Sequence, residues 1–108
     1  MLIQSKLTNF CSSIFIKLGM DREKAKDTSK ILVEADMMGH STHGVRLLPL
    51  YVKDIEEGNM NVSGSQIILN DTGSCLTIDG NMLPGIWLTK SGIQISSERA
   101  KIHGISTV

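Results

Sequence analysis

The chain has 108 residues, 41% of them hydrophobic, which gives room for one small domain with a buried core. Eleven Lys and Arg residues balance eleven Asp and Glu residues without a basic stripe, so nucleic-acid binding has no electrostatic support. No apolar run approaches a membrane span, and no charged segment precedes an apolar one at the N-terminus. We therefore expect a cytoplasmic protein with no membrane partner and, because Cys11 and Cys75 are isolated, buried free thiols.

Two amphipathic helices are predicted first. Over 3–18, apolar residues recur at steps of three and four, which places them on one helical face, and Gly19 follows as a stop. The residues of this face are Ile3, Leu7, Phe10, Cys11, Ile14 and Leu18. Asp21 is a good N-cap for a second helix that reaches about Met38 and ends at Gly39. Its narrow apolar face consists of Ala25, Leu32 and Ala35.

A third helix is predicted after the polar segment 39–44. Ser41 or Thr42 can cap this helix, which runs to Glu57 and ends at Gly58. Pro49 lacks an amide proton and crowds the preceding turn, so we expect a kink or a break there.

The hydrophobic period then changes from that of a helix to that of a strand. Segments 66–69 and 75–78 are short, apolar and β-branched, and the turn-rich stretch between them predicts a hairpin. Pro84 suits the first position of a fourth helix that runs to about Ile102, and a further strand begins over 105–108. A domain rarely ends on an apolar run with nothing to close it, so we expect a truncated domain.

The sequence thus predicts a mixed α/β fold. It comprises three N-terminal helices, a hairpin, a long helix and the start of a further strand. We expect residues 1–108 to form a single N-terminal portion of a domain, helical over 1–58, with the hairpin, helix and strand over 62–108.

The densest cluster of reactive side chains lies between Asp36 and Tyr51. Its members are Asp36, His40, Ser41, Thr42, His43, Arg46 and Tyr51. Thr42 and His43 are neighbours at a predicted helix N-terminus, where unpaired backbone amides favour a carboxylate or phosphate. Histidine titrates near neutral pH and can exchange a proton with a hydroxyl group. The pattern therefore suggests an anion clamp beside an acid/base, although a capping Ser or Thr beside a histidine is also common at helix starts.

The three histidines allow two other roles, metal binding and a surface position at a helix end. His40 and His43 stand three residues apart with Asp36 nearby, a spacing that can bind zinc. No third strong ligand is fixed by the sequence and Gly44 breaks the context, so no metal site is predicted. His103 is expected to be a surface residue at a helix end, where its charge suits the helix dipole.

Segment 36–45, Asp-Met-Met-Gly-His-Ser-Thr-His-Gly-Val, followed by Leu-Pro-Leu-Tyr-Val over 48–52 and by Gly58, resembles the malate/L-lactate dehydrogenase family. Asp79-Gly80 and the stretch 100–105 also fall where that family has an Asp-Gly and a helix–strand junction. The resemblance implies an oxidoreductase that uses NAD or NADP, a small 2-hydroxy or 2-oxo acid as substrate, and a homodimer. In that family the cofactor-binding segments come later in the chain, so no residue here is assigned to the cofactor, and these residues alone are expected to be inactive.

The same resemblance implies roles for individual residues. His43 matches the family's catalytic histidine, Thr42 stands where the family usually has serine, and Tyr51 matches a tyrosine that lines the substrate site. Arg46 and His40 are the remaining candidates for substrate binding; taken alone, Arg46 would be a solvated charge and Tyr51 a half-buried amphipathic side chain.

The chain departs from the family pattern at one position. The family arginine corresponds to Leu47, and Arg46 beside it points about 100° away around a regular helix. This loss favours an alternative, a non-catalytic interaction or regulatory domain that retains the shape of the dehydrogenase N-terminus.

Overall fold

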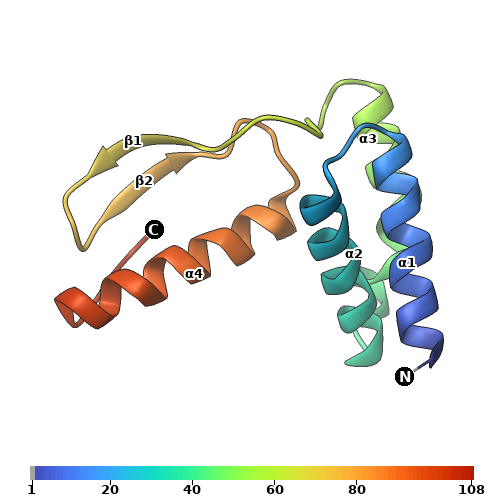
Figure 1. The fold of residues 1–108 in the computed structure, drawn as a ribbon, viewed down its shortest axis with the longest axis horizontal. Helices are drawn as coiled ribbons and strands as arrows, with labels where there is room; N and C mark the ends of the chain where they lie inside the picture. Colours follow the sequence, from blue (N-terminus) through green and yellow to red (C-terminus); the bar gives the residue numbers. More distant parts are fainter. Residues whose placement is uncertain (1) are drawn as a thin grey trace. The chain divides into compact units, whose positions relative to one another are not determined.

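The computed structural model describes residues 2–108, which divide into two compact units, one over 2–63 and one over 64–108. Four α-helices, two short 3-10 helices and one two-stranded sheet make up the described chain, a mixed α/β fold as predicted (Figure 1). Within the described residues, none of the helices has the length and apolar character needed to span a membrane.

The first unit is built on a pair of helices, α1 (Leu2–Lys17) and α2 (Arg22–Met37), that lie side by side (Figure 1). Gly19 joins them in the left-handed backbone region, with φ +98°, which glycine adopts without a steric penalty. Asp21 caps α2, since its carboxylate accepts a hydrogen bond from the Lys24 amide (2.9 Å). Both predicted helices are therefore confirmed, to within one residue at most ends.

The buried face of α1 differs from the predicted one. Cys11 and Phe15, one turn apart, are both fully buried, whereas Phe10 is 57% exposed and Ile3 81% exposed. The prediction that included Phe10 and Ile3 and omitted Phe15 was wrong, because apolar residues surround much of this helix and periodicity alone cannot choose among them.

The buried face of α2 is also broader than predicted. It consists of Ala25, Thr28, Ser29, Leu32 and Val33. The two hydroxyl residues could not be recognised by hydrophobicity, and Ala35, which was predicted to face the core, is only half-buried.

The third helix begins later than predicted. Two 3-10 helices, η1 (Ser41–His43) and η2 (Val45–Leu47), precede α3 (Leu48–Glu56). The N-cap positions of η1 and η2 belong to His40 and Gly44, so the expected cap by Ser41 or Thr42 was wrong. Pro49 lies in the first turn of α3, where its missing amide proton costs nothing, and it therefore causes no kink.

The second unit is a hairpin beside a long helix. Strands β1 (Ile67–Asp71) and β2 (Leu76–Asp79) pair antiparallel, with an irregularity between Ile68 and Asn70. Helix α4 (Gly85–His103) follows, with Pro84 as its N-cap, one residue outside the predicted position. The hairpin and the long helix are thus confirmed.

The residues after α4 return to the hairpin. Thr107 forms a parallel bridge with Cys75, in which the Leu76 amide donates to the Thr107 carbonyl (2.9 Å) and the Thr107 amide to the Ser74 carbonyl (2.8 Å). This bridge is the expected start of a further strand. Cys75 is exposed at this edge, so the prediction of two buried thiols holds for Cys11 only.

An ion pair links the hairpin turn to α4. The Arg99 guanidinium donates to both carboxylate oxygens of Asp71 (2.5 and 2.7 Å) and to the Gly73 carbonyl (2.7 Å). This two-pronged contact holds the pKa of Asp71 down, at about 2, mainly through the hydrogen bonds from Arg99. His103 is exposed in the last turn of α4, as predicted.

Candidate active site

The predicted site residues lie on the segment that joins α2 to α3 and on α3 itself. His40, Thr42, His43 and Arg46 are all exposed, and Tyr51 is half-buried on α3. The structure brings one pair of them into direct contact, since Thr42 Oγ1 and His43 Nδ1 are 2.9 Å apart.

The contact between Thr42 and His43 orients the imidazole ring. If the threonine hydroxyl donates to Nδ1, the proton of the neutral ring is on Nε2; if Nδ1–H donates to the hydroxyl oxygen, Nε2 is a proton acceptor. In both cases Nε2 is the nitrogen left to exchange a proton with a molecule outside the chain. A small residue with a hydroxyl group beside a histidine is thus a plausible acid/base unit on chemical grounds.

Asp36, near the end of α2, binds the backbone of the segment that joins α2 to α3. The Val45 amide donates to Asp36 Oδ2 (2.9 Å), so the carboxylate satisfies the first turn of η2 as an N-cap residue would. A Cβ atom on Gly44 would collide with the same carboxylate, which explains why glycine is required there. Asp36 was grouped with the reactive side chains from the sequence; its bond across nine residues could not be recognised from spacing.

Four amides at the predicted anion site are hydrogen-bonded within the chain. The amides of His43, Gly44 and Leu47 donate to carbonyls within the segment, and the Val45 amide donates to Asp36. An anion does lie at the start of the helix, as the electrostatics of helix termini predict, but it is the chain's own carboxylate.

Tyr51 packs into the first unit. Its ring is tilted by 51° against that of Phe15, with 6.2 Å between the ring centroids, which is within the range of favourable aromatic pairs. Burial, and to a smaller extent the nearby Asp54 carboxylate, raises the pKa of the Tyr51 phenol above its usual value.

Leu47 occupies the position where the resemblance implies an arginine. It is half-buried, whereas Arg46 is exposed. Both belong to a 3-10 helix, so their side chains are separated by about 120° and not by the 100° expected of a regular α-helix. The Arg46 side chain therefore projects in a different direction from the one that an arginine at position 47 would take.

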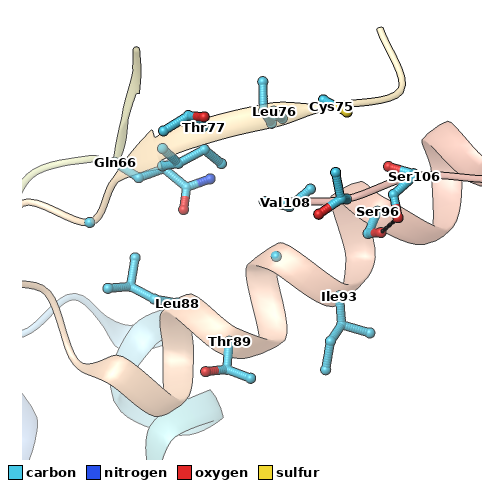
Figure 2. A pocket seen from close by; sticks show the side chains of 14 residues that line it. Gln66, Cys75, Leu76, Thr77, Leu88, Thr89, Ile93, Ser96, Ser106 and Val108 are labelled. Atoms are coloured by element: carbon cyan, nitrogen blue, oxygen red, sulfur yellow. Dashed lines mark hydrogen bonds between the residues drawn. The ribbon is translucent and has the colours of Figure 1, made fainter. Parts of the chain in front are cut away.

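A groove of about 840 Å³ lies in the second unit between the hairpin, α4 and the last residues (Figure 2). Leu76 and Thr77 of β2, Leu88 and Ile93 of α4 and Val108 are among its lining side chains (Figure 2). The residues that line it include no Lys, Arg, Asp or Glu.

A pyrophosphate in this groove would meet no cationic side chain and would depend on backbone amides. The described part of the chain also contains no cluster of three or more His, Cys, Asp or Glu side chains placed to hold a metal ion. The sequence did not predict this groove, which depends on how the hairpin and α4 pack.

Comparison with known proteins decides the family. Residues 3–108 match the family model for malate/L-lactate dehydrogenase. The chain belongs to this family. It is 36% identical over 91 residues to the malate/(S)-sulfolactate dehydrogenase of Methanothermus fervidus, covering 84% of this chain and 27% of that protein. It is 28% identical over 102 residues to hydroxycarboxylate dehydrogenase B of Escherichia coli O157:H7, covering 94% and 28% of the two chains.

Solved structures of family members share the fold. The structure of malate dehydrogenase from Pyrococcus horikoshii OT3 superposes with a TM-score of 0.92 and 30% identity, over 95% of this chain and 30% of that one. The sulfolactate dehydrogenase of Methanocaldococcus jannaschii gives a TM-score of 0.88 and 26% identity, over 91% and 28%. The chain thus spans less than a third of the length of these relatives.

Proposed function

We propose that the complete natural polypeptide containing these residues is a dehydrogenase that transfers a hydride between NAD or NADP and a small 2-hydroxy or 2-oxo acid. The observation that carries this proposal is the hydrogen-bonded Thr42–His43 pair, exposed on a segment that lies within the family match over 3–108. The names of the relatives, which include malate, sulfolactate and hydroxycarboxylate dehydrogenases, support the substrate class.

His43 would move a proton at the substrate oxygen. Its Nδ1 is engaged by Thr42, so Nε2 would donate a proton to the oxygen of a 2-oxo acid during reduction and take it back during oxidation. Thr42 would keep the ring in the orientation that this transfer needs.

Arg46 and His40, both exposed on the same segment, would bind the substrate carboxylate, and Tyr51 would line the pocket. Leu47 cannot form an ion pair, and the Val45 amide is already bonded to Asp36. Binding of the substrate carboxylate would therefore depend on Arg46 and His40 and on residues outside these 108.

The nicotinamide cofactor supplies the redox chemistry when bound. These 108 residues alone would bind the cofactor weakly and would not catalyse turnover, because in the family that they resemble the cofactor-binding segments come later in the chain. We also propose that the complete protein is a homodimer, as the resemblance implies, and that it is cytoplasmic. Analytical ultracentrifugation measures the oligomeric state directly.

The test uses the complete protein and follows oxidation of NADH and NADPH with oxaloacetate, pyruvate and sulfopyruvate. We expect turnover of at least one acid, and a loss of about 100-fold or more for His43→Ala, the typical contribution of a general acid. His103→Ala is the matched control, because His103 is also exposed but lies at the end of α4, and it should leave the rate unchanged.

Leu47 favours the second candidate, a non-catalytic interaction or regulatory domain, since the family's arginine is absent there. The same assay separates the two. Absence of turnover by the complete protein with every acid and both cofactors would support the domain, and unchanged turnover in His43→Ala would remove His43 from the mechanism.

A further inference from the structure

The segment between α2 and α3 is held by an interlock, which we define as the Asp36 carboxylate, Gly44 and the Val45 amide. The carboxylate accepts the Val45 amide hydrogen (2.9 Å) and occupies the space that a Cβ on residue 44 would need. Gly44 is buried, and directly precedes η2 while directly following His43. The interlock therefore fixes the backbone immediately after the proposed acid/base.

From this geometry we propose that Asp36 is a positioning residue for the Thr42–His43 pair. It touches neither member of the pair through a side-chain bond given by the structure, but it determines where the backbone of residue 44 runs. The expected effect of Asp36 on the reaction rate rests on the proposed function. The fixed backbone at residues 44 and 45 rests on the interlock alone.

Three observations support a fixed segment. The His40 amide donates to the Ala35 carbonyl (2.8 Å), which ties the start of η1 to the end of α2. The His43 amide donates to the His40 carbonyl (2.9 Å), and the Leu47 amide to the Gly44 carbonyl (3.0 Å), so each short helix closes on itself. The join between the two helices, at Gly44 and Val45, is the place where Asp36 supplies the hydrogen-bond acceptor.

The place of this join, one residue after His43, would let Asp36 affect His43 without touching it. A hydrogen-bonded turn that loses its acceptor gains backbone freedom, and a displacement of about 1 Å at a reacting group can lower a rate by about 100-fold. Loss of the interlock would therefore be felt at His43, one residue before Gly44.

The decisive variants are Asp36→Asn and Asp36→Ala, made in the complete protein. Asparagine keeps a side-chain oxygen that can accept the Val45 amide hydrogen, whereas alanine removes it. We expect kcat in Asp36→Asn to stay within about tenfold of the wild type and kcat in Asp36→Ala to fall about 100-fold, with a much smaller change in KM. Glu34→Gln is the control, since Glu34 is a carboxylate on the same helix whose partner is the surface Lys30.

Amide hydrogen exchange at Val45 provides a readout that does not depend on activity. Protection of this amide should persist in Asp36→Asn and be lost in Asp36→Ala. If the wild-type protein turns over no acid, the proposed function fails, and the exchange at Val45 together with the NMR shift of the His43 ring still decides whether Asp36 positions the segment.

A third variant covers the case in which Asp36→Ala does not fold. Gly44→Ala forces a Cβ against the carboxylate and should shift the His43 ring resonance and lower kcat. In the double variant Asp36→Ala/Gly44→Ala, kcat should be no lower than in the poorer single variant, because the two residues share one contact. Two results would overturn the proposal: wild-type kcat and unchanged Val45 exchange in Asp36→Ala or Gly44→Ala, or an Asp36→Asn loss of kcat equal to that of His43→Ala with Val45 protection intact. The second result would mean that the carboxylate's charge or proton, and not its position, is needed.

Discussion

Replacing Thr28 by valine should stabilise the protein, although it removes a hydroxyl group. Thr28 lies on the buried face of α2 with no exposed surface, and its Oγ1 has no hydrogen-bond partner among the residues that the structure describes. A buried hydroxyl without a partner costs about 1–3 kcal/mol relative to water. Valine has nearly the same shape and the same branching at Cβ, so neither a cavity nor a large change in helix propensity offsets the gain.

We therefore expect Thr28→Val to raise the free energy of unfolding by about 1 kcal/mol. For a chain of this size that corresponds to a rise in Tm of about 4–8 °C. Thermal and urea unfolding of the 108-residue chain, followed by circular dichroism, measure both quantities. Thr8→Val is the matched control, because Thr8 Oγ1 donates to the Gln4 carbonyl (2.9 Å), and its loss should destabilise by about 0.5–1 kcal/mol.

The opposite result would be a Thr28→Val variant whose free energy of unfolding falls as that of Thr8→Val does. Such a result would mean that the Thr28 hydroxyl is hydrogen-bonded in solution, for example to a carbonyl of the preceding turn of α2.

Three further predictions concern titration and reactivity. Tyr51 is the only tyrosine, so its ionisation can be followed by ultraviolet absorbance, which should give a pKa above the usual value. The free energy of unfolding should fall as pH rises past the pKa that Tyr51 has in the unfolded chain, because the folded state retains the proton. An NMR titration should place the pKa of Asp71 at about 2, and Arg99→Ala should raise it toward the usual 3.8; the stability that this pair adds is present above that usual value and lost as pH falls toward 2. A thiol reagent should label the exposed Cys75 in the native protein and Cys11 only after unfolding, since burial both shields the Cys11 thiol and raises its pKa; equal labelling of both in the native state would contradict the fold.

Local signals in the sequence predicted the elements well. Asp21, Gly19 and Gly58 marked helix ends because capping and left-handed glycine are decided by a few neighbouring residues. The turn-rich stretch after β1 marked the hairpin for the same reason.

Features that depend on packing could not be predicted in this way. Phe15, and not Phe10, is buried because the partner helix selects one side of an α1 that is apolar over much of its surface. Pro49 was expected to cause a kink or a break; the helical run does change beside it, from η2 to α3, but α3 itself is not kinked by Pro49, which lies in its first turn. In the candidate site, the sequence singled out Thr42 and His43 because they are adjacent in the chain. The hydrogen bond from the Val45 amide to Asp36 could not be predicted, because the turn between these two residues determines how closely they approach.

The measurement that tests the account most directly is the rate of NADH and NADPH oxidation by the complete protein, with a saturating 2-oxo acid, in the wild type and in His43→Ala. We expect a measurable wild-type rate with at least one acid and a fall of about 100-fold or more in His43→Ala, with His103→Ala unchanged. A wild-type rate of zero with oxaloacetate, pyruvate and sulfopyruvate, or equal rates in the wild type and His43→Ala, would contradict it.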